Sequence, residues 1–152
     1  MTEILIDTNV LVYCHDLAEE KKRAHAIRVV YELQQHRLGC LSIQCISEFF
    51  NTVTRGKRQL LTLEEATEQA YVLINSFPLF PLTPMVVMDA MTGAKNHSIA
   101  YYDAQIWACA HLNQIPVIFS EDFSDGRVIE GVRFANPFSE TFDLDSWLSG
   151  KR

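Results

Sequence analysis

The stretch E-I-L-I-D-T-N-V at residues 3–10 decides the fold. Residues Ile4 to Ile6 form a short apolar run between polar neighbours, and such a run predicts a buried strand. Because the run does not alternate with polar residues, it is typical of a parallel sheet that is covered on both faces. Asp7 follows at the carboxyl end of this strand, where open α/β sheets place their functional crevice. A helix cap made by Asp7 or Asn9 explains the same residues, so this stretch alone leaves both interpretations open.

The composition is that of an ordinary globular protein. A length of 152 residues predicts a single domain over residues 1–152. Hydrophobic residues make up 48% and charged residues 21%, both ordinary for water-soluble domains. No apolar run approaches the roughly 20 residues of a membrane span, and no basic segment typical of a signal peptide precedes the first strand. These features predict a cytoplasmic protein without a membrane partner.

The net charge and the cysteines argue against further classes of protein and of site. The formal net charge of −6 argues against a sequence-independent DNA-coating protein, although an enzyme that contacts a few phosphates is compatible with it. The four cysteines form no C-x-x-C pair and lie in apolar segments, which predicts buried, reduced thiols rather than disulfides or zinc ligands. They are Cys14, Cys40, Cys45 and Cys109.

Strands alternate with helices along the whole chain. This order predicts an α/β fold with a central, mostly parallel sheet flanked by helices. Two helix starts are marked by caps, the capping box Thr62–Glu65 and the pair Thr83-Pro84. After the first strand we expect a short helical turn over 10–13. Further helices are expected over 17–37, 42–54, 98–113 and 142–147, and one helix after each of the two caps. Strands are expected over 40–43, 116–119 and 128–136, with at best an edge strand over 77–82. Met85, Met88 and Met91 are expected to fill the core.

Four carboxylates stand out from this order. Asp7 and Asp122 each follow a buried strand, so we expect those two strands to be neighbours or near neighbours in one parallel sheet, with both acids at the same edge. Glu48 lies opposite the apolar stripe of its helix and faces either solvent or a cleft. Asp103 falls in the first turn of its helix, where the helix dipole also favours an acid. Each acid has an ordinary structural explanation, but the sheet would bring them together.

Clustered carboxylates have a definite chemistry. Acids crowded in one crevice repel each other, and a hard divalent ion such as Mg²⁺ or Mn²⁺ relieves that repulsion through oxygen ligands. A pair of such ions about 4 Å apart can activate water and stabilise the leaving oxygen in phosphodiester cleavage. The basic triplet Arg55, Lys57 and Arg58 surrounds Gly56 at a helix end. It has two explanations, favourable charges at a helix C-terminus or contacts to phosphate.

The chain resembles the PIN-domain family, in particular the VapC-type ribonuclease toxins. The resemblance rests on I-L-I-D-T-N-V-L-V-Y at 4–13, I-S-E-F-F at 46–50, Y-Y-D-A-Q-I-W-A-C-A at 101–110 and F-S-E-D-F-S-D-G at 119–126, followed by G-V-R-F-A-N-P-F. It covers nearly the whole chain and implies a three-layer PIN-like fold. The resemblance also implies that the matching acids bind Mg²⁺ or Mn²⁺ for RNA cleavage: Asp7, Glu48, Asp103 and Asp122.

The resemblance extends to neighbouring residues and to partners. Many members carry Thr where Ser120 stands, and Ser keeps the hydroxyl that can orient an acid or a water. Asn9 and Ser120 are therefore predicted to hydrogen-bond around the acids, and Asp125 to support the site or to face solvent. Members are commonly dimers inhibited by a small antitoxin, which implies a toxin–antitoxin pair. A PIN-fold RNA-binding or regulatory module without catalysis is the alternative.

Three other enzyme and signalling classes fit less well. A HAD-type phosphatase needs a second Asp two residues after the first, where this chain has Asn9. A response-regulator receiver needs a Lys after a late strand, and here that strand ends in Ser120-Glu121-Asp122. A P-loop or dinucleotide-binding protein needs a glycine-rich turn after a strand, which is missing.

Overall fold

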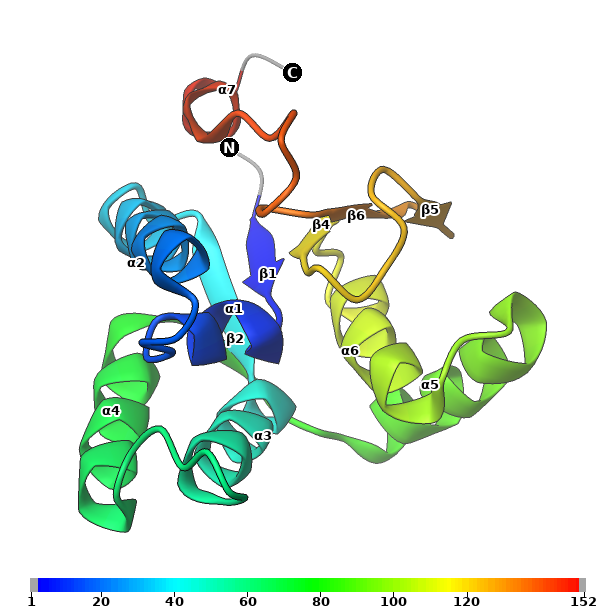
Figure 1. Cartoon of the computed structure of the whole chain (residues 1–152). Helices are drawn as coiled ribbons and strands as arrows, with labels where there is room; N and C mark the ends of the chain where they lie inside the picture. The colour runs from blue at the N-terminus through cyan, green and yellow to red at the C-terminus, as the bar shows by residue number, and fades with distance from the viewer. Residues whose placement is uncertain (1–2, 151–152) are drawn as a thin grey trace.

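The structure, a computed structural model, describes residues 3–150 and is built on one six-stranded sheet (Figure 1). The strand order is β3-β2-β1-β4-β6-β5, and every neighbouring pair is parallel except β5 and β6. The expected mostly parallel sheet is therefore confirmed. The strands are β1 (Ile4–Ile6), β2 (Gly39–Ser42), β3 (Leu79–Phe80), β4 (Val117–Phe119), β5 (Val128–Ile129) and β6 (Val132–Ala135).

Helices flank this sheet, and α2 and α6 lie on opposite sides of β1 in Figure 1. The expected helix caps are present: Thr62 and Glu65 form a complete capping box, and Thr83 caps the helix that starts with Pro84. Within residues 3–150, no helix is long and apolar enough to cross a membrane. The helices are α1 (Thr8–Tyr13), α2 (Glu20–Gln35), α3 (Ile43–Thr54), α4 (Leu63–Ser76), α5 (Pro84–His97), α6 (Tyr101–Leu112) and α7 (Leu144–Ser149).

The core forms around β1, whose residues Ile4 to Ile6 are completely buried. Burial of one such side chain stabilises the native state by about 1.5–3 kcal/mol, so this strand anchors the sheet between its helical layers. The largest fully buried side chains around it are Trp107, Phe49 and Phe119. All four cysteines are free thiols and three of them are buried, as expected.

Helices α5 and α6 pack closely because a glycine lies at their contact. A Cβ added at Gly93 would come within 2.4 Å of the Trp107 ring, which is too close for any side chain. The buried residues of α5 are the small or slender Val86, Ala90 and Gly93. The prediction that the methionines of α5 fill the core is wrong: Met85, Met88 and Met91 are 64%, 58% and 54% exposed. Their spacing of three residues is helical, but it does not say which face of the helix is buried.

The last predicted strand, over residues 128–136, is instead the antiparallel hairpin of β5 and β6. Glu130 and Gly131 form its turn with φ values of 46° and 84°, a conformation that reverses the chain. The helix expected from residue 98 begins at Tyr101, because Ser98 has a left-handed φ of 53° and ends α5. The expected edge strand shrinks to Leu79–Phe80 at the end of the sheet.

The sheet brings the two predicted strand ends together. β1 and β4 are parallel neighbours, and Ile6 pairs with Phe119. Asp7 and Ser120 therefore follow at the same edge, where the Asp7 N–H donates to the Phe119 carbonyl over 3.0 Å. The prediction that these strands are neighbours is confirmed.

Candidate active site

Asp7 lies at the carboxyl end of β1 and is only 4% exposed. Its Oδ1 accepts the Thr8 N–H at 2.7 Å, so Asp7 caps α1. Its Oδ2 accepts the Ser120 hydroxyl at 2.7 Å. The carboxylate thus serves as a cap through one oxygen while the other faces the end of β4.

The amide of Asn9 lies between the two strand-end acids. Its Nδ2 is 3.4 Å from Asp7 Oδ2 and 3.1 Å from Asp122 Oδ2, and the Ser120 hydroxyl is also 3.1 Å away. Ser120 Oγ in turn accepts the Asp122 N–H at 3.1 Å. The structure therefore places Asn9 and Ser120, both predicted to hydrogen-bond around the acids, between Asp7 and Asp122.

Glu48 and Asp103 approach the same place from two helices. The buried face of α3 carries Cys45, Ile46, Phe49 and Val53, and Glu48 lies on the other face. Glu48 is half-buried in a cleft rather than free in solvent, and its Oε2 is 3.4 Å from the Thr8 hydroxyl. Asp103 lies in the first turn of α6. The charges of Glu48 and Asp122 act on Asp103, so the four acids belong to one electrostatic cluster.

Burial and mutual repulsion change the protonation of this cluster. Burial raises the pKa of Asp7 from 3.8 to about 7, and the charges of Asp122 and Glu48 add to the rise. Hydrogen bonds from Ser120 and Thr8 oppose it without cancelling it. Burial, then the charges of Asp122 and Glu48, also raises the pKa of Asp103. A cation at this position would relieve the cost of holding these groups ionised.

A chain of hydrogen bonds that sequence reasoning did not find holds Glu48 in place. The Tyr101 hydroxyl donates to Gln105 Oε1 at 2.8 Å, and Gln105 Nε2 donates to Gln44 Oε1 at 2.7 Å. Gln44 Nε2 then donates to Glu48 Oε1 and to the Tyr102 carbonyl. Gln105 is 4% exposed in a helix that is otherwise buried through apolar residues. A polar residue at such a position was the available signal.

A second network, also missed, holds the loop after β4. The Tyr13 hydroxyl donates to Glu121 Oε1, and Lys22 Nζ pairs with Glu121 Oε2 at 3.0 Å. Lys22 also lies over the Tyr13 ring, 4.8 Å from its centroid. Because Glu121 precedes Asp122, these contacts tie the loop that carries this acid to α1 and α2.

The remaining predicted residues lie further out. Asp125 Oδ1 accepts the Asn136 N–H at 2.9 Å and so closes the loop between β4 and β6 instead of reaching the acids. Arg58 pairs with Asp16 at 2.9 Å. Lys57 is exposed, whereas Arg55 lines a groove beside Glu48. The basic triplet is thus divided among three surroundings.

The donor set suits a hard cation, but the side chains do not converge on one. Among residues 3–150, no three His, Cys, Asp or Glu side chains stand together as a ready metal site. The Asn9 amide occupies the space between Asp7 and Asp122, and Thr8 and Gln44 hold the two oxygens of Glu48. Carboxylate oxygens are the ligands that Mg²⁺ and Mn²⁺ prefer. An ion that took Asp7 Oδ2 and Asp122 Oδ2 as ligands would therefore compete with the hydrogen bonds that Asn9 donates to them.

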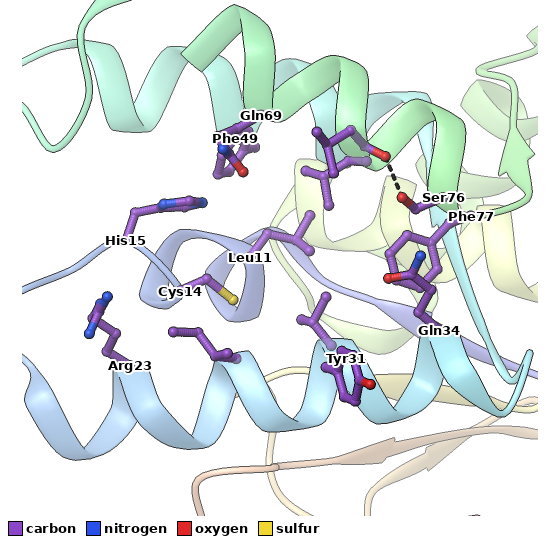
Figure 2. Close-up of a pocket in the computed structure, with 14 residues that line it drawn as sticks. Leu11, Cys14, His15, Arg23, Tyr31, Gln34, Phe49, Gln69, Ser76 and Phe77 are labelled. Atoms are coloured by element: carbon purple, nitrogen blue, oxygen red, sulfur yellow. Dashed lines mark hydrogen bonds between the residues drawn. The ribbon is translucent and has the colours of Figure 1, made fainter. Parts of the chain in front are cut away.

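Two hollows flank α1. The first, of about 340 Å³, is lined by two of the four acids, Glu48 and Asp122, and by Thr8 and Asn9 among others. The second, of about 370 Å³, is largely apolar and contains none of the four acids (Figure 2). Figure 2 shows it between α2 and α4, with Tyr31 near one end and Arg23 and His15 near the other.

Comparison with known proteins defines the class. A family model described as the PIN domain matches residues 4–124, which is most of the chain. The chain belongs to the PIN domain family, as its sequence motifs predicted. A search of curated proteins finds no match to the chain.

Solved structures with a similar fold cover nearly the whole chain. Mycobacterium tuberculosis VapC20, described as a Sarcin-Ricin loop cleaving toxin, is 19% identical with a TM-score of 0.64 over 86% of this chain and 99% of its own. VapBC2 from Rickettsia felis, bound to a DNA fragment of its promoter, is 13% identical with a TM-score of 0.65 over 89% and 98%. FitAcB from Neisseria gonorrhoeae is 20% identical with a TM-score of 0.62 over 89% and 98%. At these identities the likeness concerns the fold.

Proposed function

We propose that this protein is a divalent-metal-dependent endoribonuclease and the toxin of a toxin–antitoxin pair. The observation that carries the proposal is the gathering of Asp7, Glu48, Asp103 and Asp122 at the carboxyl ends of β1 and β4, with the pKa of Asp7 raised to about 7. Membership of the PIN domain family supports it. Burial and neighbouring negative charge raise the pKa of Asp7 and of Asp103, and a nearby divalent cation would favour the ionised form of both carboxyls.

The residues of the chain have distinct roles in this proposal. Asp7, Glu48, Asp103 and Asp122 would hold the metal, which lowers the pKa of a bound water and neutralises the leaving oxygen of the phosphodiester. Ser120 keeps Asp7 oriented through its hydroxyl. Water would be the nucleophile if an ion were held there, so no histidine has the role of general base in this proposal.

A small antitoxin is the proposed protein partner. Its proposed docking place is the apolar hollow of Figure 2, where Ile27, Tyr31 and Val72 are 42%, 55% and 54% exposed. Arg23 at one end is half-buried, and its positive charge suits an acidic residue of the partner. The similar fold of VapBC2 and of a Klebsiella pneumoniae toxin-antitoxin complex supports a partner of this kind. A homodimer is proposed as well, and the exposed methionines of α5 are apolar surface available for it.

The test is cleavage of RNA with and without metal. EDTA should abolish cleavage by the wild-type protein, and Mg²⁺ or Mn²⁺ should restore it. Asp103→Asn should lose most of the rate while keeping the fold, because Asn is tolerated in a helix's first turn, which circular dichroism can check. Full activity in EDTA, or an undiminished Asp103→Asn protein, would contradict the proposal.

The second candidate is a PIN-fold RNA-binding or regulatory module without catalysis. The position of the Asn9 amide between Asp7 and Asp122 favours this second function. The amide donates to both carboxylates and so already offsets part of the repulsion between them without a metal. The same experiment separates the two functions. A module would bind RNA equally well in EDTA and in Mn²⁺ and would leave the RNA intact in both.

A further inference from the structure

A groove of about 530 Å³ runs between α3 and the start of α6, and Glu48 is among the residues that line it. Its walls include Asn51 from α3, Arg55 at the end of that helix and Tyr102 from α6. Glu48 and Thr52 line both this groove and the hollow that Glu48 shares with Asp122. The two depressions therefore share a wall, and a chain molecule that passes the acids can continue into the groove.

The α3 wall of the groove carries unused hydrogen-bonding groups. Ser47 and Asn51 lie four residues apart on one exposed face of α3, and Arg55 follows as the exposed residue that caps the end of the helix. In the described part of the chain, their side chains have no hydrogen-bond or ion-pair partner. Arg58 differs, because Asp16 neutralises it at 2.9 Å. The groove thus offers one unpaired cation and two small polar side chains.

The opposite wall offers a rigid aromatic face. Tyr102 is 69% exposed, yet its ring rests edge-to-face on Tyr101 with centroids 5.3 Å apart. Tyr101 is itself anchored through its hydroxyl to the buried Gln105. Tyr102 also directly precedes Asp103, one of the four acids. An exposed aromatic ring held this firmly beside the proposed reaction centre is ready to stack on a flat ligand.

We propose that this groove holds an unpaired nucleotide of the RNA next to the phosphate that is cleaved. The base stacks on Tyr102, Asn51 and Ser47 hydrogen-bond to the edge of the base, and Arg55 contacts a neighbouring phosphate. Bases can be stacked on aromatic side chains only where they are not enclosed in a double helix, so the groove selects single-stranded loops or ends. This inference rests on the proposed nuclease function, whose substrate it specifies.

The test measures binding apart from cleavage. A short single-stranded RNA with one 2-aminopurine base is titrated with the protein in EDTA, and gel electrophoresis verifies that the RNA stays intact. Stacking should quench the 2-aminopurine fluorescence. Tyr102→Ala should weaken binding about fivefold or more and abolish the quenching, because stacking of a base on an aromatic ring contributes at least that much. Tyr102→Phe keeps the ring and should behave like the wild type.

Matched controls identify the groove. Tyr71 on α4 is 62% exposed and lines neither depression, so Tyr71→Ala should bind like the wild type. Arg55→Ala should reduce the slope of log binding constant against log salt concentration by about one, the value for one phosphate contact. Arg58→Ala should leave that slope unchanged. Equal binding and quenching by Tyr102→Ala and the wild type would overturn the inference, as would an equal loss in Tyr71→Ala. A wild type that binds and quenches but cleaves nothing in Mn²⁺ defeats the proposed catalysis and leaves the groove assignment standing.

Discussion

Replacement of Asp7 by Asn should stabilise the metal-free protein at pH 8. Burial raises the pKa of this carboxyl from 3.8 to about 7, so keeping it ionised at pH 8 costs the native state about 4 kcal/mol. Asn carries no charge and can still accept the Thr8 N–H. Its amide nitrogen cannot accept from Ser120, and loss of that bond costs about 1–2 kcal/mol. The net gain of about 2–3 kcal/mol raises the melting temperature by about 4–12 °C in a protein of this size.

The pH dependence has a definite sign. Between pH 3.8 and about 7 the native state holds the Asp7 proton and the unfolded chain does not. Wild-type stability from this group is therefore greatest below pH 3.8, falls as pH rises to about 7, and is constant above that. The Asp7→Asn variant does not lose stability in this way as the pH rises, because its side chain does not ionise. Its advantage over the wild type should be largest at pH 8, vanish at about pH 5, where the ionisation cost equals the loss of the Ser120 bond, and reverse near pH 4.

Thermal melts at pH 4 to 8, with and without Mn²⁺, measure both effects. Mn²⁺ should raise the melting temperature of the wild type by mass action, and Asp7→Asn should lose that response. Asp125→Asn is the matched control, because Asp125 is exposed and bonded to the Asn136 N–H, which an amide oxygen can also accept. A gain in Asp7→Asn that does not change with pH would refute the assignment of the raised pKa. An unchanged response to Mn²⁺ would remove Asp7 from the metal site.

Three further predictions concern packing, positioning and substrate. Gly93→Ala should lower stability by about 1–3 kcal/mol in urea unfolding, because its Cβ would meet the Trp107 ring at 2.4 Å, and an unchanged midpoint would show that the α5–α6 contact yields easily. Gln105→Met should lower kcat more than it raises KM, since Glu48 loses its orienting chain, and wild-type kcat in a folded variant would dismiss that role. Replacing the basic residues Arg55, Lys57 and Arg58 together by Ala should weaken RNA binding and flatten its salt dependence. A salt slope identical to that of the wild type would exclude phosphate contacts there.

Local pattern was sufficient for the architecture. The apolar run of β1 has one stable environment, a sheet covered on both faces, and its position before Asp7 placed that acid at the functional edge. Strand–helix alternation then implied parallel neighbours, so the approach of Asp7 to the end of β4 was predictable. The capping box at Thr62 was readable as well, because both of its partners lie within one turn of helix.

Tertiary packing decided what periodicity leaves open. A three-residue spacing marks a helix face but not the neighbour it meets, so the methionines of α5 were misplaced while Gly93 and Ala90 made the contact. The orientation of Glu48 depends on Gln105, which lies 57 positions away along the chain, and only the packing of α3 against the start of α6 joins them. The pKa of Asp7 has the same origin, because burial by surrounding elements, rather than any local motif, removes the water that would stabilise its charge.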